Sequence, residues 1–217
     1  MQGENDRITT TPGGSDKFYT SGLRLGWTSG TDHVPELAAR AAQGLWGDGI
    51  TRISFDLTHL IFSPTNTTRL LPDPRDHPVA GYLAGIISLL QDTERSRSVA
   101  AFTLGVIGSA ALGRQVQNGF HHLIRSPLNN GWASQLPNEP AIGLLGERTW
   151  RLGLIKDSGL EMDILPSFTI GAGTVRTYMQ SGVVLRFGQE LDRDFGVSRL
   201  RPGQTGGDTF AYRPGLA

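Results

Sequence analysis

The sequence predicts an all-β fold of about eight antiparallel strands, with one amphipathic helix in a long connection between two of them. Three observations lead to this prediction. Large apolar residues alternate with small or polar residues over stretches of about ten residues, which is the period of a β-strand. Glycine is abundant, with 29 residues, as expected where many strands meet at turns or pack closely. Only the stretch "GRQVQNGFHHLI" at 113–124 shows a clear helical period.

The alternation divides each predicted strand into a large apolar face and a small or polar face. In "FYTSGLRLGW" the apolar face comprises Tyr19, Leu23, Leu25 and Trp27, opposite Thr20, Gly22, Arg24 and Gly26. The same division recurs in "RISFDLTHLI", where Ile61 shares the apolar face with Phe55 and Leu57, and in "TWRLGLIK" and "YMQSGVVLRFGQE". The expected strands span about 3–9, 17–29, 50–62, 79–91, 97–107, 147–157, 160–171 and 178–189.

Two architectures produce such alternation, a soluble β-sandwich and a transmembrane β-barrel. The sandwich is the commoner one, with its apolar faces packed together inside. Two features favour the barrel instead. The small faces carry glycine together with Arg or Asp in mid-strand, as a crowded polar lumen would, and the strands are long for a sandwich but suited to a tilted membrane crossing. A transmembrane antiparallel β-barrel is therefore the favoured fold class.

The helical stretch lies in the longest connection, Ser109 to Gly146. On its polar surface Gln117 stacks with His121, and Asn118 with His122, at the spacing i, i+4. The other three histidines, His33, His59 and His77, lie outside this group. A second connection, "HVPELAARAAQGLWGDG", has a composition that allows another short helix. The apolar stripe of the first helix consists of Val116, Phe120, Leu123 and Ile124.

The bulk composition excludes several classes of protein. Twenty basic residues balance twenty acidic ones, so no strong field attracts nucleic acid, and we expect no nucleic-acid partner. Cysteine is absent, which excludes disulfides and thiolate metal sites. The start "MQGENDRITT" has no basic region followed by an apolar run, so we expect that it contains no signal peptide.

Counting alternating strand directions brings five polar residues to one rim of the sheet. This rim collects the end of the first strand, the start of the second, the end of the third and the whole 109–146 connection. Asn5, Asp6, Thr20, Arg69 and His121 all belong to it. An amide, a carboxylate, a hydroxyl, a guanidinium and an imidazole together are the groups that hydrolytic chemistry requires.

The residues also resemble a known family. "ENDR" at 4–7, "FYTSGLRLGW" at 18–27, "FSP" at 62–64, "GVIGSAALGRQVQNGFHHLI" at 105–124 and "GWASQLPNEP" at 131–140 are similar to outer-membrane lipid A deacylases, which remove the 3′-linked acyloxyacyl group. The resemblance implies a twelve-stranded outer-membrane barrel, with a calcium-dependent site between the barrel wall and a helix of an extracellular loop. It identifies the helix at 113–124 as that loop helix.

The resemblance also implies a role for each rim residue. The family's histidine base falls on His121, its Asn-Asp pair on Asn5 and Asp6, and its hydroxyl residue on Thr20. A lysine of the family aligns with Arg69, which keeps the charge but changes its geometry. The implied mechanism is like that of calcium-dependent secreted phospholipases, in which the histidine takes a proton from water and Ca²⁺ stabilises the oxyanion. Asp6 and Asn5 supply hard oxygen ligands for Ca²⁺.

Other interpretations of the same residues remain open. Asn-Asp pairs most often form turns, a threonine in a strand needs no functional explanation, and of two adjacent histidines one is usually structural. A non-catalytic barrel of the same ancestry, such as a porin or scaffold, is the main alternative to an esterase. A soluble β-protein that binds a small apolar ligand is the third possibility. For the esterase we expect lipid A as substrate, outer-membrane lipid as surroundings, a location in the bacterial outer membrane and a monomer.

The extent of the chain relative to its family is a further expectation. Residues 1–217 correspond to a single barrel domain, in which the resemblance is exhausted by about the eighth strand. The tail from Leu191 to Ala217 resembles a connection into a next strand. We therefore expect a fragment that lacks the signal peptide and the C-terminal strands. Its eight strands then form an open sheet whose first and last strands are unpaired at their outer edges.

Overall fold

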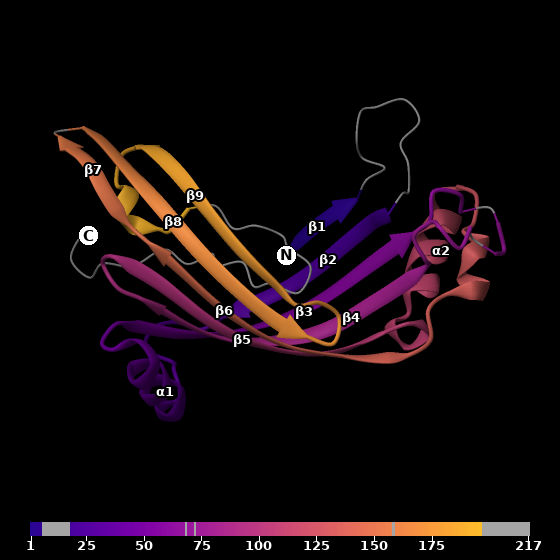
Figure 1. Ribbon diagram of the computed structural model, residues 1–217, viewed down its shortest axis with the longest axis horizontal. Coiled ribbons are helices and arrows are strands. Elements are labelled where there is room, and N and C mark those ends of the chain that lie inside the picture. Colours follow the sequence, from indigo (N-terminus) through magenta and orange to yellow (C-terminus); the bar gives the residue numbers. More distant parts are fainter. Residues whose placement is uncertain (6–17, 68, 72, 158, 197–217) are drawn as a thin grey trace. The chain divides into compact units, whose positions relative to one another are not determined.

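The computed structural model describes residues 1–5, 18–67, 69–71, 73–157 and 159–196, and this part of the chain consists mainly of β-strands (Figure 1). No helix within these residues has the length and apolar character needed to cross a membrane. The α-helices are α1 (Glu36–Trp46) and α2 (Gly113–Leu123), and short 3₁₀ turns span Ser109–Ala111, Asn130–Ser134 and Leu191–Arg193. The strands are β1 (Gln2–Asn5), β2 (Phe18–Thr28), β3 (Ile50–Ser63), β4 (Ala80–Asp92), β5 (Ser96–Ile107), β6 (Glu139–Trp150), β7 (Leu152–Asp157), β8 (Leu160–Gly173) and β9 (Tyr178–Gly188).

All these strands belong to one sheet, in which neighbours in sequence are mostly neighbours in space. The order is β1-β2-β3-β4-β5-β6-β8-β7, and β9 also pairs with β8. The ladders β1–β2, β6–β8, β7–β8 and β8–β9 are antiparallel. Among the strands that the structure describes, this path has two ends, and no ladder joins β1 to β9. The antiparallel fold class and the open path expected from the sequence are confirmed.

β6 and β7 are two halves of one long strand that is interrupted at Arg151. Both pair with β8, β6 through Gly143–Thr149 and β7 through Leu152–Asp157, with an irregularity between Gly153 and Ile155. The expected strand at 147–157 therefore begins eight residues too late, because the structure places 139–146 in β6. Pro140 and the glycines at 143 and 146 suggest a loop, but proline is tolerated at the start of a strand.

The chain divides into two compact units, each of which takes segments from several strands. Unit 1 comprises Met1–Gly26, Asp56–Ile86 and Thr103–Ile142, and it contains α2. Unit 2 comprises Trp27–Phe55, Ile87–Phe102 and Gly143–Ala217, and it contains α1.

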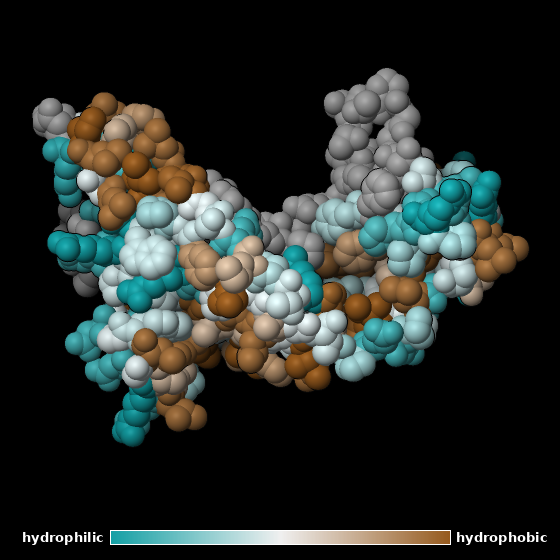
Figure 2. All heavy atoms as spheres, viewed as in Figure 1, coloured by the Kyte–Doolittle hydropathy of each residue, from teal (hydrophilic) through white to brown (hydrophobic). Residues whose placement is uncertain are grey.

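Burial in both units is inverted relative to a soluble protein. In unit 1, Leu23, Leu25 and Leu57 are exposed, whereas Arg24 and Asp56 are buried. In unit 2 the exposed residues include Leu152, Leu154, Leu185 and Phe187, and the buried ones include Arg52, Asp92, Arg97 and Asp163. Figure 2 shows apolar side chains on the surface of unit 2, over the outer ends of β7 and β8. A soluble sandwich would bury these leucines, so the burial pattern favours the membrane barrel.

Tyr19 departs from the expected alternation. The sequence places it on the exposed face with Leu23, but the structure packs it against the buried cluster of Leu60 and Tyr82. The reason is Gly22, because a Cβ atom on this residue would lie 2.0 Å from the Tyr19 hydroxyl. The missing side chain lets the tyrosine ring turn onto the buried face.

The buried charges are paired within each unit. In unit 1, the Arg24 guanidinium lies 2.6 Å from the Asp56 carboxylate. In unit 2, Asp92 accepts hydrogen bonds from both Arg52 and Arg97, and the Arg97 Nε lies 2.7 Å from Asp92 Oδ1. Buried charges without such partners are costly, so these pairs are what allows the strands to turn their polar faces inward.

A second charged cluster in unit 2 surrounds Phe195. Two guanidinium groups approach the ring, with its centroid 5.1 Å from the Cζ of Arg97 and 4.1 Å from that of Arg151. Arg186 binds Asp163 and donates a hydrogen bond of 2.5 Å to Asp194. The segment after β9 is thus bound to the charged face of its own unit.

We expect Asp92→Ala to destabilise the fold by about 3–5 kcal/mol, because it leaves Arg52 and Arg97 buried without their shared carboxylate. Urea unfolding of the chain in detergent micelles, followed by tryptophan fluorescence, measures this loss. The matched control is Asp73→Ala, which removes the acidic partner of the exposed Arg75 and should change stability little. Equal losses in the two variants would contradict the role assigned to Asp92.

Candidate functional site

The candidate site lies in unit 1, where α2 and the connection after it fold onto the ends of β3 and β4. The helix begins after a backbone turn in which Gly108 and Leu112 have positive φ angles of 101° and 61°. Gly108 cannot carry a side chain there, because a Cβ atom would lie 2.5 Å from the carbonyl oxygen of Pro137. The structure confirms the helix expected over 113–124, with bounds of Gly113–Leu123.

Two glycines allow α2 to lie directly against β4. A Cβ atom on Gly81 would lie 3.1 Å from the backbone nitrogen of Gly113, and one on Gly113 would lie 2.4 Å from the Trp132 ring. His59 secures the start of the helix from β3, because its Nε2 lies 2.8 Å from the carbonyl oxygen of Ala111 and donates to it. The sequence leaves His59 outside the site, whereas in the structure it contacts Ala111, the last residue of the 3₁₀ turn that precedes α2.

Both faces of the sheet are covered at this end. Adjacent strand residues point to opposite sides, and Leu60 packs with Tyr82 on one side. Ile61 packs with Val79 and Trp132 on the other. Ile61 therefore lies on the apolar face, as expected, but the connection that carries Trp132 buries it.

A network of buried amides joins the helix, the strand and the connection. The Gln117 carbonyl oxygen accepts hydrogen bonds from Trp132 Nε1 at 2.8 Å and from Asn129 Nδ2 at 2.9 Å. The amide nitrogens of Gln117 and Asn129 each donate to the Ser63 hydroxyl at 3.4 Å. Gln117, Asn129 and Ser63 are all buried, so each bond replaces water that these groups have lost.

Asn118 holds the chain that returns from the helix. Its carbonyl oxygen accepts from the Asn129 backbone nitrogen at 3.0 Å, and its amide donates to the Asn129 carbonyl at 3.3 Å. The segment after β3 is bound to the same connection, because Asn130 N donates to Thr67 O and the Ser134 hydroxyl donates to Leu70 O. These contacts define the position of the helix face that carries His121.

His121 and His122 differ in their surroundings, although they are adjacent in sequence. His121 is 6% exposed, and its Nδ1 lies 2.7 Å from the Pro127 carbonyl oxygen. A carbonyl only accepts, so Nδ1 carries the hydrogen and the lone pair of the neutral ring is on Nε2. His122 is on the exposed side of the helix. Of the pair, the structure builds only His121 into the helix–strand junction.

The other residues predicted for the site are placed as follows. Thr20 is buried, and its hydroxyl has no hydrogen-bond partner among the residues that the structure describes. Arg69 is exposed, and its carbonyl oxygen lies 3.6 Å from where a Cβ on Gly131 would be, so its backbone adjoins the connection after α2. The backbone of Asn5 pairs with Ser21, the residue next to Thr20. Asp6 lies outside the described residues.

Within the described part of the chain, no three His, Cys, Asp or Glu side chains gather closely enough to hold a metal ion. At the rim predicted for the site, the Thr20 hydroxyl is an oxygen donor that suits a hard cation. It is buried and has no hydrogen-bond partner among the described residues, and its neighbour Ser21 pairs with Asn5 in the ladder.

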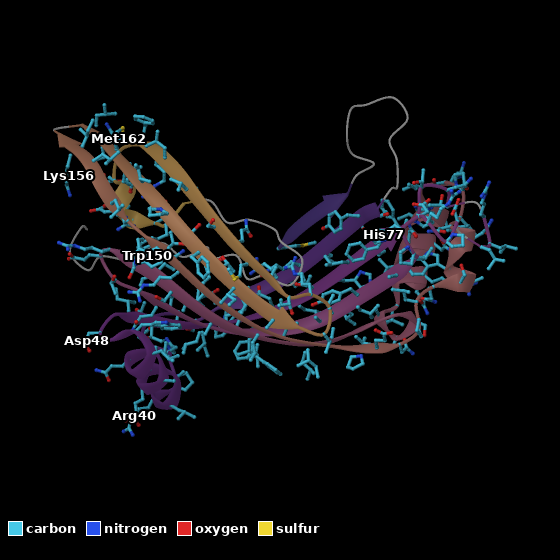
Figure 3. The ribbon with its side chains drawn as sticks, viewed as in Figure 1. Arg40, Asp48, His77, Trp150, Lys156 and Met162 are labelled. Atoms are coloured by element: carbon cyan, nitrogen blue, oxygen red, sulfur yellow. The ribbon has the colours of Figure 1, made fainter. Side chains whose placement is uncertain are left out.

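Asp76 shapes the loop between β3 and β4. It accepts hydrogen bonds from the backbone nitrogens of His77 at 2.7 Å and Thr65 at 2.8 Å, and these bonds hold the pKa of its carboxyl below the ordinary 3.8. The His77 ring, labelled in Figure 3, stacks on Phe62, and 5.8 Å separates the two ring centroids. Because folding lowers the pKa of Asp76, its hydrogen bonds stabilise the folded loop fully at pH values above the ordinary pKa. This stabilisation is lost as the pH falls through the lowered pKa.

Sequence reasoning missed three residues of the network, Ser63, Asn129 and Trp132. Ser63 and Trp132 lie in "FSP" and "GWASQLPNEP", two of the blocks that carry the family resemblance. A signal for them was therefore present. The contacts with Ser63 were not predictable, because they join segments more than 50 residues apart in the chain.

The comparisons with known proteins agree with this architecture. The model of the family described as "Outer membrane protein LpxR" matches residues 1–215. Among solved structures, LpxR from Salmonella typhimurium matches with a TM-score of 0.67 and 22% sequence identity, over 84% of this chain and 58% of the Salmonella chain. The chain thus spans less than two thirds of that structure. No curated protein matches the sequence. The expected outer-membrane fold class and location are confirmed.

We expect Gly113→Ala to loosen the site, because the new methyl group would overlap the Trp132 ring. Overpacking of this kind costs about 1–3 kcal/mol. Trypsin cleavage after Arg114 or Arg125 in the folded protein should accelerate as the helix detaches. Gly119→Ala is the matched control in the same helix, because a Cβ there meets nothing within 4 Å and alanine favours the helix. Faster cleavage in Gly119→Ala, or unchanged cleavage in Gly113→Ala, would refute this packing.

Proposed function

This chain belongs to the LpxR family of outer-membrane proteins, and on that premise we propose that it hydrolyses the 3′-linked acyloxyacyl ester of lipid A. The observation that carries the proposal is the placement of His121. It is a buried histidine whose Nδ1 is held by a backbone carbonyl, on a helix that packs against the sheet. Family similarity alone would also suit a non-catalytic barrel, and the held Nδ1 of His121 favours the esterase because it leaves Nε2 as the basic nitrogen of the neutral ring.

In the proposed reaction His121 acts as a general base. Its Nε2 takes a proton from water, and the resulting hydroxide attacks the ester carbonyl carbon. The bond between this carbon and the sugar oxygen then breaks, and His121 returns the proton to the departing oxygen. The products are the free acyloxyacyl acid and the sugar hydroxyl. The hydrogen bond from Nδ1 to Pro127 supports this role, because it orients the ring and keeps the lone pair on Nε2.

The side of the sheet on which α2 lies supports a lipid substrate. Along β3, Leu57, His59, Ile61 and Ser63 alternate with the buried polar face and so point to the same side. Leu57 is exposed, whereas the later three are covered by α2 and its connection. A lipid that moves along the apolar face therefore meets the helix–strand junction directly, without entering a lumen.

We propose that the remaining rim residues assist at the ester. Thr20 offers a hydroxyl without a hydrogen-bond partner in the described structure, and Arg69 offers an exposed cation suited to the phosphates or the oxyanion. We further propose that Asn5 and Asp6 hold Ca²⁺, for which amide and carboxylate oxygens are appropriate ligands. When bound, Ca²⁺ supplies positive charge to the oxyanion that develops on the ester carbonyl.

We expect His121→Gln to lower deacylation by about 10²–10⁴-fold, the usual loss when a general base is removed. His122→Gln is the matched control, because it changes the exposed neighbour on the same helix and should retain substantial activity. Mass spectrometry of lipid A from cells that express each variant measures the loss of the 3′-linked chain. Equal loss in both variants would eliminate His121 as the specific base. Full activity in His121→Gln would eliminate the mechanism.

We expect a calcium chelator to inactivate the protein, and added Ca²⁺ to restore it. Mg²⁺ should substitute poorly, because it demands tighter octahedral geometry. Asp6→Ala should lose activity that millimolar Ca²⁺ does not recover, whereas Asp32→Ala, which changes an exposed carboxylate in the loop after β2, should behave as the unchanged protein. Release of fatty acid from purified lipid A is the readout. Full activity in excess chelator would rule out the calcium site. It would not affect the assignment of His121 as the base, which the His121→Gln and His122→Gln variants test independently.

A further inference from the structure

Helix α1 in unit 2 has an apolar side that nothing in the described structure covers. Its residues Leu37, Ala41 and Leu45 recur every four positions and so form one stripe along the helix. Leu37 is 82% exposed and Leu45 is 63% exposed. The helix already packs on an adjacent side through Ala42, which is fully buried. The exposed stripe is therefore additional to the surface that holds α1 on its unit.

The polar side of α1 is distinct from this stripe. It carries Glu36, Arg40 and Gln43, and Glu36 pairs with Arg40 at 2.5 Å across one helical turn. Figure 3 shows Arg40 directed away from the strands of its unit. Gln43 donates to Asp48 at 2.8 Å, just beyond the end of the helix. Because its one acid and one base pair with each other, the helix presents no net charge.

The strands that precede and follow α1 in the chain also expose apolar side chains. Trp27, at the end of β2, is 56% exposed and stacks on the exposed Phe55 with 5.9 Å between ring centroids. Ile50, the first residue of β3, is also exposed. These side chains belong to the apolar face that an outer-membrane protein turns toward lipid. In the chain, the uncovered stripe of α1 thus lies between two strand ends that expose apolar side chains.

We propose that α1 lies in the membrane interface, with Leu37, Ala41 and Leu45 inserted among phospholipid acyl chains. A helix with one apolar side and one polar side adopts this position, and tryptophan at the neighbouring strand end is typical of the same depth. Since α1 has no net charge, zwitterionic phospholipids are sufficient partners, and anionic lipid is not required.

The absence of cysteine makes this proposal directly testable, because a single introduced cysteine can be labelled uniquely. A fluorophore at Leu45→Cys probes the stripe, and one at Arg40→Cys on the opposite side of the same helix is the matched control. Leu57→Cys, on the exposed face of β3, provides a reference for lipid contact. The full chain is folded into phosphatidylcholine vesicles, or into phosphocholine micelles with the same lipid. Quenching is compared between brominated acyl chains and aqueous iodide.

We expect brominated lipid to quench the Leu45→Cys probe, as it does the Leu57→Cys probe, and iodide to reach mainly the Arg40→Cys probe. Leu37→Cys should repeat the Leu45→Cys result. Equal access of iodide to Leu45→Cys and Arg40→Cys, without quenching by lipid, would overturn the proposal. Protection of Leu45→Cys from both quenchers would also overturn it, because a protein surface such as a second copy would then cover the stripe. Neither result depends on the catalytic assignment of His121.

Discussion

The constraint on which the rest of this structure depends is that its strands turn their large apolar side chains outward. Every charged group on the other face must then find a partner inside. Asp92 shared by Arg52 and Arg97, and Asp56 paired with Arg24, meet this requirement in the two units. Glycine has a related role on the same face, since Gly22 leaves room for the Tyr19 ring. An outward apolar face is stable in lipid only because the inward polar face is closed by ion pairs and small residues.

The candidate site uses the same outward face but covers it with protein. At the end of β3, the alternation that exposes Leu57 presents His59, Ile61 and Ser63 to α2 and its connection. α2 and the connection after it contact Ser63 through polar groups, whereas the Trp132 ring of the connection makes an apolar contact with Ile61. His121 lies on α2, so the proposed base is at the boundary between the buried amide network and the lipid-facing surface. That location suits an enzyme whose substrate is itself a membrane lipid.

The two helices make different use of the strand ends that they follow. α2 buries Gln117 and His121 against the sheet, through glycines that permit close contact and amides that satisfy each other. α1 buries only Ala42 and leaves its leucines uncovered. One helix therefore builds a polar junction with the protein, and the other retains apolar surface beside strands that face lipid. The proposed chemistry and the proposed membrane contact follow from this difference in what each helix leaves exposed.

The sequence by itself determined the strand period, the inverted faces and the helix at 113–124, because alternation and helical spacing are properties of neighbouring residues. It also singled out His121, through the block that carries the family resemblance. Only the tertiary structure decided that His121 is buried while His122 is exposed, and that Nδ1 of His121 donates to Pro127. It alone showed that β6 begins at Glu139 and that Ser63, Asn129 and Trp132 complete the network. The physical reason is distance along the chain. Ser63 and Gln117 are 54 positions apart, and only the paired strands bring them within hydrogen-bond range.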